Sequence, residues 1–391
     1  MEKVIEVHTE EFGSQPEIVV TAPSKFDIIG EHSSFFNDKT LSMAIDLPVY
    51  VALSKRTDNL LRFFYYQQKE RKKIPLSITK HRKEDKLANI VKAVIAGYAI
   101  EGYSFSGFDV TFFSEISPSV EFGITSALKS ATAFAIKKLF KIRGNDSFLL
   151  RVIENGDKQL FNSEFYSSDI NTSLFAKKNS CIVTDSSDNS YQIVPFKFEG
   201  MSIILTDTKV PRATMWSETS LYSEENKELM LSLKRKRNSQ TIYEDSISEI
   251  NDVLCNLSEE VRRRLMCIMK ENQNLIDAVD ALKNSNLHNF AKIVNKSHEL
   301  MRDLFMISCP EIDWLVKRVQ EFDQNSLPVL FSCSRITGRG FARCTYSIIK
   351  DEYVDSYMQK LQDFERIFGF HPTTYIVRPS AGASIIKELD K

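Results

Sequence analysis

The sequence predicts an α+β protein with two domains, and three observations lead to this expectation. The chain has 391 residues, which is more than a single hydrophobic core ordinarily organises. Its first half alternates β-rich runs with amphipathic helical patterns. Its second half has a long helical stretch, then strands and a further helix, as in an antiparallel sheet backed by helices. We place the boundary near residue 200, giving domains at 1–200 and 201–391.

The elements of the first half follow from hydrophobic periodicity and turn residues. The pattern at 86–103 has apolar residues at helical spacing and ends near Gly102. Runs rich in β-branched and aromatic residues predict strands, and SDNS predicts the turn of a hairpin. We expect strands at 17–29, 41–56, 61–67 and 105–116, helices at 86–103 and 147–162, and a hairpin at 180–196. The segment 119–140 is expected to pass from a turn at Gly123 into a long amphipathic helix.

In the second half, residues 217–299 are almost entirely helical in pattern and poor in glycine and proline. A strand at 201–208 precedes this region. After it we expect strands at 329–336 and 342–350 on either side of a TGRG turn, a helix at 352–369 and a strand at 373–379.

Composition excludes several classes of function. Hydrophobic residues make up 42% of the chain and charged residues 26%, which is typical of a globular protein. The net charge of −1 gives no indication of a nucleic-acid or membrane partner, and the KRKR run at 234–237 is typical of a solvated helical face. The six scattered cysteines form no CxxC pair. Without a signal peptide or an apolar run of about 18 residues, we expect a cytoplasmic protein.

Three segments carry the candidate chemistry. The first is a strand that ends in GEH at residues 30–32, the second is the turn at Gly123 that opens a helix, and the third is TGRGF at 337–341. A turn that leads into a helix presents unpaired N–H groups and a positive dipole end to an anion. Thr125 and Ser126 in the first turn fit such a site, but they also fit ordinary helix capping.

Together these segments resemble the motifs of the GHMP kinase superfamily, and those of galactokinases in particular. APSKFDIIGEHSSFFND (22–38) resembles APGRVNLIGEHTDYNGG. SVEFGITSALKSATAFAI (119–136) is similar to the phosphate loop PxGAGLSSSAALEVA, and SRITGRGFARCTYSIIK (334–350) to RMTGAGFGGCTVALV. NKSHELMRDLFMISCPEIDWLV (295–316) resembles MNESHxSLRDxYEVSCPELDxLV, which is specific to galactokinases. The resemblance extends from about residue 18 to 383.

The resemblance implies the fold and the reaction. The fold would combine an N-terminal domain like ribosomal protein S5 with a ferredoxin-like C-terminal domain, and the active site would lie in the cleft. The activity would be transfer of a phosphoryl group from ATP, with Mg²⁺, to the anomeric hydroxyl of galactose or a related sugar. No nucleic acid or membrane would take part, and we expect a monomer or a weak dimer.

Asp169 is the candidate catalytic base, because YSSDINTSLFAKKNSCIVTD resembles the family pattern GIMDQFxS followed by LIDC, with Asp185 as the second aspartate. One carboxylate near the sugar hydroxyl suffices to accept the proton in phosphoryl transfer. The alternative for Asp169 is a structural role as a helix cap. Lys25 stands at the family's catalytic arginine. Asp157, near a metal-binding glutamate of the family, and Ser126 are the candidate Mg²⁺ ligands. A plain surface charge is the alternative for Asp157.

The resemblance assigns the remaining positions to substrate and nucleotide. Glu31, His32, Ser34 and Asp27 are the candidate sugar-binding residues. A buried Glu31–His32 pair that satisfies itself is the alternative. The candidate nucleotide-binding residues are Gly123, Thr125 and Ser126, and the glycines of the third motif are Gly338 and Gly340.

Several departures from the family patterns fall on functional positions. Lys25 replaces an arginine, Ser34 replaces the aspartate that fixes the sugar, and Glu121 replaces the first glycine of the phosphate loop. Arg339 and Arg343 are new in the third motif, either as anion contacts or as surface charges. A sugar kinase is favoured. A non-catalytic sugar or nucleotide sensor and a kinase of another small molecule remain alternatives.

Overall fold

The computed structural model describes residues 2–36, 38–78, 80–116, 122–162, 165–211, 221, 223–236, 255, 257–326, 328–339 and 343–388. The chain divides into two compact units, each built from separate segments. Unit 1 consists of Met1–Phe26, Ser42–Ile182 and Pro379–Lys391, and unit 2 consists of Asp27–Leu41 and Val183–Arg378. The division into domains at 1–200 and 201–391 stays a prediction.

The first sheet has eight strands in the order β12–β1–β2–β5–β3–β4, and β6 pairs with β2 and β7. Strand β3 runs parallel to β5, and β2–β5 and β3–β4 are antiparallel. The strands are β1 (Ile18–Ile29), β2 (Lys39–Lys55), β3 (Leu60–Tyr65), β4 (Glu70–Pro75), β5 (Phe108–Ser114), β6 (Ser180–Asp185), β7 (Tyr191–Pro195) and β12 (Ser384–Glu388).

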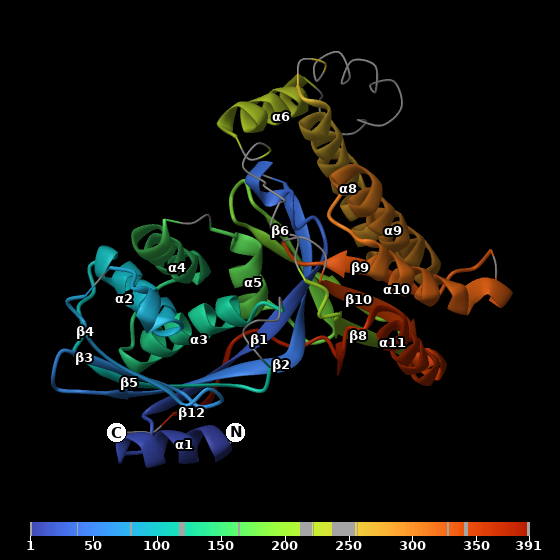
Figure 1. Ribbon diagram of the computed structural model, residues 1–391. Helices are drawn as coiled ribbons and strands as arrows, with labels where there is room; N and C mark the ends of the chain where they lie inside the picture. Colours follow the sequence, from blue (N-terminus) through green and yellow to red (C-terminus); the bar gives the residue numbers. More distant parts are fainter. Residues whose placement is uncertain are drawn as a thin grey trace. The chain divides into compact units, whose positions relative to one another are not determined.

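In unit 1, helices cover both faces of this sheet. Helix α1 (Glu2–Phe12) lies on one face, and α2 (Ala88–Ile100), α3 (Ile124–Leu139) and α4 (Asp146–Phe161) lie on the other (Figure 1). Helix α5 (Ser167–Phe175) and a 3₁₀ turn at Lys83–Asp85 complete the unit. Gly97 and Gly156 let helices α2 and α4 pack closely against each other. A Cβ atom on Gly97 would lie 1.8 Å from the carbonyl oxygen of Val152. A Cβ atom on Gly156 would lie 2.0 Å from the carbonyl oxygen of Ala93.

His8 makes a buried polar contact that joins α1 to the sheet. Its ring nitrogens lie 2.9 Å from Thr111 Oγ1 and 2.9 Å from Ser54 Oγ, and the side chain is fully buried. Burial lowers the pKa of His8 to about 4. The imidazole is therefore neutral in the folded protein at neutral pH.

This burial predicts a pH dependence of stability. The unfolded imidazole takes up its proton near pH 6.5 and the folded one only near pH 4, so stability is complete above pH 6.5 and falls as the pH drops through this window. We expect wild type to lose about 3 kcal/mol more of its unfolding free energy than His8→Gln between pH 7 and pH 4. Urea unfolding of both proteins across this range measures the difference. Parallel pH profiles would contradict the assignment.

The second sheet lies in unit 2 and is antiparallel, with the order β11–β8–β10–β9. Its strands are β8 (Met201–Asp207), β9 (Cys333–Thr337), β10 (Cys344–Lys350) and β11 (Thr373–Val377). The helices are α6 (Glu224–Lys236), α8 (Glu259–Lys283), α9 (Leu287–Leu300), α10 (Pro310–Gln320) and α11 (Val354–Phe368), with a π-helical turn at Met301–Phe305 and 3₁₀ turns at Ser34–Phe36, Glu321–Ser326 and Asp351–Tyr353. Helices α8 and α9 pack side by side (Figure 1).

The predicted strands at 17–29, 41–56, 61–67 and 105–116 are confirmed, as are helices at 86–103 and 147–162. The predicted passage from a turn at Gly123 into a helix is confirmed, since α3 begins at Ile124; residues 117–121 lie outside the described ones. The strand predicted at 329–336 is wrong at its start, since β9 begins at Cys333. Elements α1, β4, α5 and β12 were not predicted.

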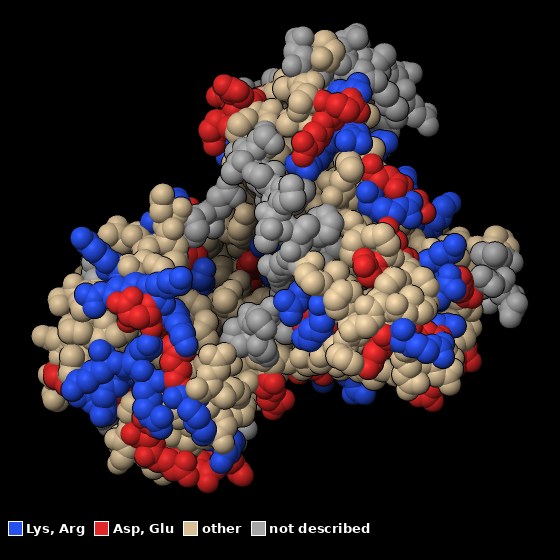
Figure 2. Space-filling model, in the orientation of Figure 1, with Lys and Arg blue, Asp and Glu red and all other residues tan. Residues whose placement is uncertain are grey.

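The helical pattern at 217–299 is confirmed where the structure describes it, by α6, α8 and α9. The end of α6 carries the first part of the basic run, and Arg237 lies outside the described residues. Acidic and basic side chains are interspersed on the face drawn in Figure 2. None of the six cysteines, all of which lie among the described residues, takes part in a disulfide bond. None of the described helices combines the length with the apolar composition that a membrane-spanning segment requires.

Candidate functional site

The predicted phosphate loop of unit 1 meets strand β1 at Gly123, which precedes the first residue of α3. Gly123 has a φ of +69°, and a Cβ at this position would lie 2.7 Å from Lys25 Cγ. The Lys25 amide also donates to the Phe122 carbonyl at 3.0 Å. Glycine is therefore required both by the left-handed backbone and by the close approach of β1. No side chain caps this helix at Gly123, so its first-turn N–H groups are suited to an anion.

Asp169 lies in the first turn of α5, and two of the other predicted residues reach its carboxylate. The Lys25 ammonium forms an ion pair with Oδ1, and Ser126 Oγ donates to Oδ2 at 3.3 Å. The side chain of Lys25 is 5% exposed and that of Asp169 15% exposed. Asp169 is not the N-cap of α5, a position held by Tyr166, so the capping alternative is wrong. The structure thus brings together the predicted base, its cation and a phosphate-loop hydroxyl.

Asp157 lies on α4 and is buried, so its alternative reading as a surface charge is wrong. Lys129 Nζ lies 2.7 Å from Oδ2, while Oδ1 is buried without a hydrogen-bond partner among the described residues. Burial raises the pKa of the Asp157 carboxyl, the charge of Asp169 adds to the rise, and Lys129 opposes it.

The free oxygen of Asp157 suits a hard cation such as Mg²⁺. The described residues hold no cluster of three or more His, Cys, Asp or Glu side chains able to bind a metal. An ion at Asp157 would therefore need further oxygen ligands, such as the Ser126 hydroxyl or phosphate oxygens of a nucleotide. The residues present fit a nucleotide-bound Mg²⁺ better than a metal site made by the protein alone.

In unit 2, Glu31 is bound to an arginine of the third motif. Arg335 donates to the two Glu31 carboxylate oxygens at 2.6 and 3.0 Å, to Glu271 Oε2 at 3.2 Å and to Ser297 Oγ at 2.6 Å. Arg335 is 0% exposed and Glu31 1% exposed. The Glu31 carboxylate is thus satisfied within unit 2 by Arg335, which is a different partner from the His32 named in the alternative. Direct contact of Glu31 with a sugar stays a prediction.

His32 is buried beside Phe305, with ring centroids 4.4 Å apart. Burial, and next the positive charge of Arg335, lowers the pKa of His32 well below its usual value, so the imidazole is neutral at neutral pH. Ser34 begins a 3₁₀ turn. Asp27 is buried, and its carbonyl accepts a hydrogen bond of 2.8 Å from Thr337 Oγ1. Sugar binding by these residues stays a prediction.

The new arginines of the third motif have defined partners. Arg339 Nε donates to the Glu31 carbonyl at 3.1 Å, and its guanidinium lies 3.9 Å from the Asp27 carboxylate. Arg343 donates to the two oxygens of buried Asp207 at 2.7 and 3.0 Å. Neither is the plain surface charge that we considered. Gly338 has a φ of +98°, and Gly340 lies outside the described residues.

Two further predictions concern acidic residues. Glu121, expected to repel a triphosphate, lies outside the part of the chain that the structure describes. Asp185 ends β6, with its carboxylate 3.9 Å from the Lys39 ammonium.

Sequence reasoning missed Lys129, Glu271 and the role of Arg335. Arg335 carried a signal, because it matches the arginine that opens the family pattern RMTGAG. Lys129 also carried one, since it stands where the phosphate-loop pattern has alanine. Glu271 sits in an amphipathic helix, where a glutamate gives no sign of being buried.

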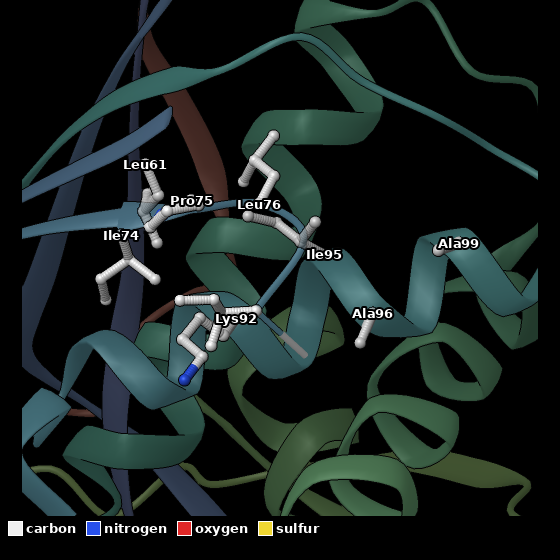
Figure 3. Close-up of a pocket in the computed structure, with 9 residues that line it drawn as sticks. Leu61, Ile74, Pro75, Leu76, Lys92, Ile95, Ala96 and Ala99 are labelled. Atoms are coloured by element: carbon white, nitrogen blue, oxygen red, sulfur yellow. The ribbon is translucent and has the colours of Figure 1, made fainter. Parts of the chain in front are cut away.

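A pocket elsewhere in unit 1 lies between β3, the β4 end and α2, and its lining is mostly apolar (Figure 3). The Lys92 ammonium at its edge is bonded to Asp85 Oδ2 at 2.8 Å, Asn89 Oδ1 at 3.1 Å and the Lys80 carbonyl at 2.6 Å. None of the predicted site residues lines this pocket, and its one charged side chain is already paired.

Comparison with solved structures defines the class of fold. Galactokinase of Lactococcus lactis, solved with galactose, matches 98% of this chain and 99% of its own with a TM-score of 0.85 and 20% identity. Mevalonate kinase of Methanococcus jannaschii matches 94% of this chain and 99% of its own with a TM-score of 0.63 and 16% identity. The fold is therefore the α+β fold of GHMP kinases.

Sequence comparison narrows this class. The galactose-binding signature of galactokinases matches residues 6–55. A protein of Treponema pallidum named "Putative galactokinase" is 36% identical over 390 residues, which covers 99% of this chain and 97% of that protein. The chain belongs to the galactokinase family, a family of sugar kinases.

Proposed function

We propose that this protein transfers the γ-phosphoryl group of ATP to the anomeric hydroxyl of galactose or a closely related sugar. The observation that carries the proposal is the group formed by Lys25, Asp169 and Ser126 beside the start of α3. Phosphoryl transfer needs a positioned base, a positive charge and N–H donors for phosphate, and this part of unit 1 has candidates for all three.

In this proposal each side chain has a defined task. The Asp169 carboxylate accepts the proton of the attacking hydroxyl, and the Lys25 ammonium holds that carboxylate in place and offsets charge that develops in the transition state. The N–H groups at the start of α3 bind phosphate oxygens. Asp157 Oδ1 and Ser126 Oγ would hold Mg²⁺, which neutralises phosphate charge when bound.

The sugar would be held by the segment that follows β1. Arg335 fixes the Glu31 carboxylate, and neutral His32 can donate or accept one hydrogen bond. Ser34 is shorter and uncharged where galactokinases have aspartate, so we expect weaker discrimination among hexoses. A cytoplasmic, monomeric or weakly dimeric enzyme, without nucleic-acid or membrane partners, completes the proposal.

An ADP-release assay with MgATP and a panel of acceptors tests the substrate. Galactose, talose, galactosamine, glucose and mevalonate would be compared at the same concentration, with Asp169→Asn as the background control. Turnover with galactose or another galactose-configured sugar supports the proposal. Turnover with mevalonate alone would identify a kinase of a different small molecule, and nucleotide binding without turnover on any acceptor would identify a non-catalytic binding protein.

Removing the charge of Lys25 is expected to slow the reaction strongly. Lys25→Met keeps most of the side-chain length but leaves the Asp169 carboxylate without this cation, so we expect kcat to fall by about 10²-fold or more. Lys25→Arg, which restores the family's residue, should retain more activity than Lys25→Met. Steady-state kinetics of the three proteins measure this order. A Lys25→Met enzyme with kcat within about threefold of wild type would contradict the role.

A further inference from the structure

Lys129 occupies an unusual place in the phosphate-loop helix. It lies on α3 one turn after Ser126, and its ammonium is 2.7 Å from Asp157 Oδ2 on α4. The side chain of Lys129 is 18% exposed and that of Asp157 5% exposed, so water screens this ion pair only in part. The phosphate-loop pattern that this segment resembles has alanine at this position, so the positive charge is a feature of this chain.

Each carboxylate of the unit 1 site therefore has an ammonium partner within the protein. Lys25 pairs with Asp169, and Lys129 pairs with Asp157. A divalent cation that approaches Asp157 finds one carboxylate oxygen engaged by a positive charge and the other, Oδ1, without a partner among the described residues. The free oxygen permits binding of the cation, while the ammonium nearby repels it.

We infer that Lys129 acts as a built-in cation of the triphosphate site, which competes with the divalent metal for Asp157 and supplies part of its charge to the phosphates. The inference rests on the proposed function, since it assigns a nucleoside triphosphate to this site. It predicts that binding of the metal-free nucleotide depends on Lys129, whereas binding of the metal is weakened by it.

A purely structural clip between α3 and α4 would behave differently. Loss of such a clip would lower the melting temperature and would weaken metal and nucleotide binding together, because both depend on the same two helices. If the Lys129 ammonium instead competes with the metal, its removal should strengthen metal binding and weaken nucleotide binding. The signs of the two changes therefore separate the explanations.

The experiment measures two affinities by titration, with no turnover. Binding of AMP-PNP in EDTA is followed by calorimetry, and binding of Mn²⁺ to the protein saturated with AMP-PNP is followed by the electron paramagnetic resonance signal of free Mn²⁺. The proteins are wild type, Lys129→Ala, Asp157→Asn and the double variant. Lys138→Ala is the matched control, because Lys138 lies on the same helix with its ammonium over the Phe134 ring.

We expect Lys129→Ala to weaken AMP-PNP binding in EDTA by about tenfold and to tighten Mn²⁺ binding by about tenfold, as one neighbouring charge would. In the Asp157→Asn background the effect on Mn²⁺ should shrink to within about twofold, and Lys138→Ala should change neither affinity. If Lys129→Ala does not fold, Lys129→Gln replaces it. Unchanged affinities, or weakening of both, would overturn the inference alone. Failure of wild type to bind AMP-PNP under either condition would overturn the proposed function as well.

Discussion

Asp169→Asn is expected to reduce kcat for sugar phosphorylation by about 10²- to 10⁴-fold, the range for loss of a general base. The amide has nearly the shape of the carboxylate, so it can still accept a hydrogen bond from Ser126, but it cannot take up the hydroxyl proton. It also leaves Lys25 without its anionic partner at a site where that ammonium is 5% exposed. Steady-state kinetics with MgATP and the best sugar of the panel measure the effect, which should fall mainly on kcat.

The matched control is Asp188→Asn in the turn between β6 and β7. Asp188 Oδ1 accepts a hydrogen bond from the Ser190 amide in an exposed turn, and Asp188 is not among the residues proposed to bind sugar, nucleotide or metal. The same chemical change there should leave kcat within about twofold of wild type. An Asp169→Asn enzyme as active as the Asp188→Asn enzyme would contradict the role of Asp169 as base.

Arg335→Ala is expected to destabilise unit 2 by about 3–5 kcal/mol, as in other proteins that lose one partner of a buried ion pair. The substitution leaves the carboxylates of Glu31 and Glu271 buried without their shared guanidinium and removes a donor from Ser297. Urea unfolding followed by circular dichroism measures the loss. If the variant does not accumulate in folded form, Arg335→Lys keeps one positive charge and should give a smaller loss in the same direction.

Arg366→Ala is the control for this prediction. Arg366 also pairs with a carboxylate, at 2.7 Å from Asp363 Oδ1, but its side chain is 78% exposed. Solvent-exposed ion pairs contribute little to stability, so we expect Arg366→Ala to change the free energy of unfolding by about 0.5 kcal/mol or less. Equal effects at Arg335 and Arg366 would show that the buried network does not hold the segment after β1 in place.

The sequence predicted best those features that depend on neighbours along the chain. The runs at 17–29 and 86–103 have clear strand and helix periodicity, and both elements are present. Helix α5 was missed because SSDINTSLF is short and mostly polar, so its apolar residues give little helical signal. Strand β12 was missed because its pairing with β1 depends on the opposite end of the chain.

The residues of the candidate site that lie within sequence motifs could be predicted, whereas their long-range contacts could not. Lys25, Ser126 and Asp169 could be found because each stands within a motif, and the structure places them in contact. The pairing of Glu31 with Arg335 joins residues 304 positions apart, and no local pattern specifies it. Lys129 departs from the alanine of the phosphate-loop pattern, but its pairing with Asp157 was not predicted, because a lysine on an amphipathic helix ordinarily faces solvent.

Phosphorus nuclear magnetic resonance of the protein with MgATP and galactose tests the central claim most directly, because it identifies the product itself. We predict that the γ-phosphate signal of ATP disappears while ADP and a sugar phosphate ester appear, with the ester phosphorus coupled to the anomeric proton. Asp169→Asn should leave the spectrum of ATP unchanged over the same time. ATP that stays intact with wild type and every sugar of the panel would contradict the assignment of this protein as a sugar kinase.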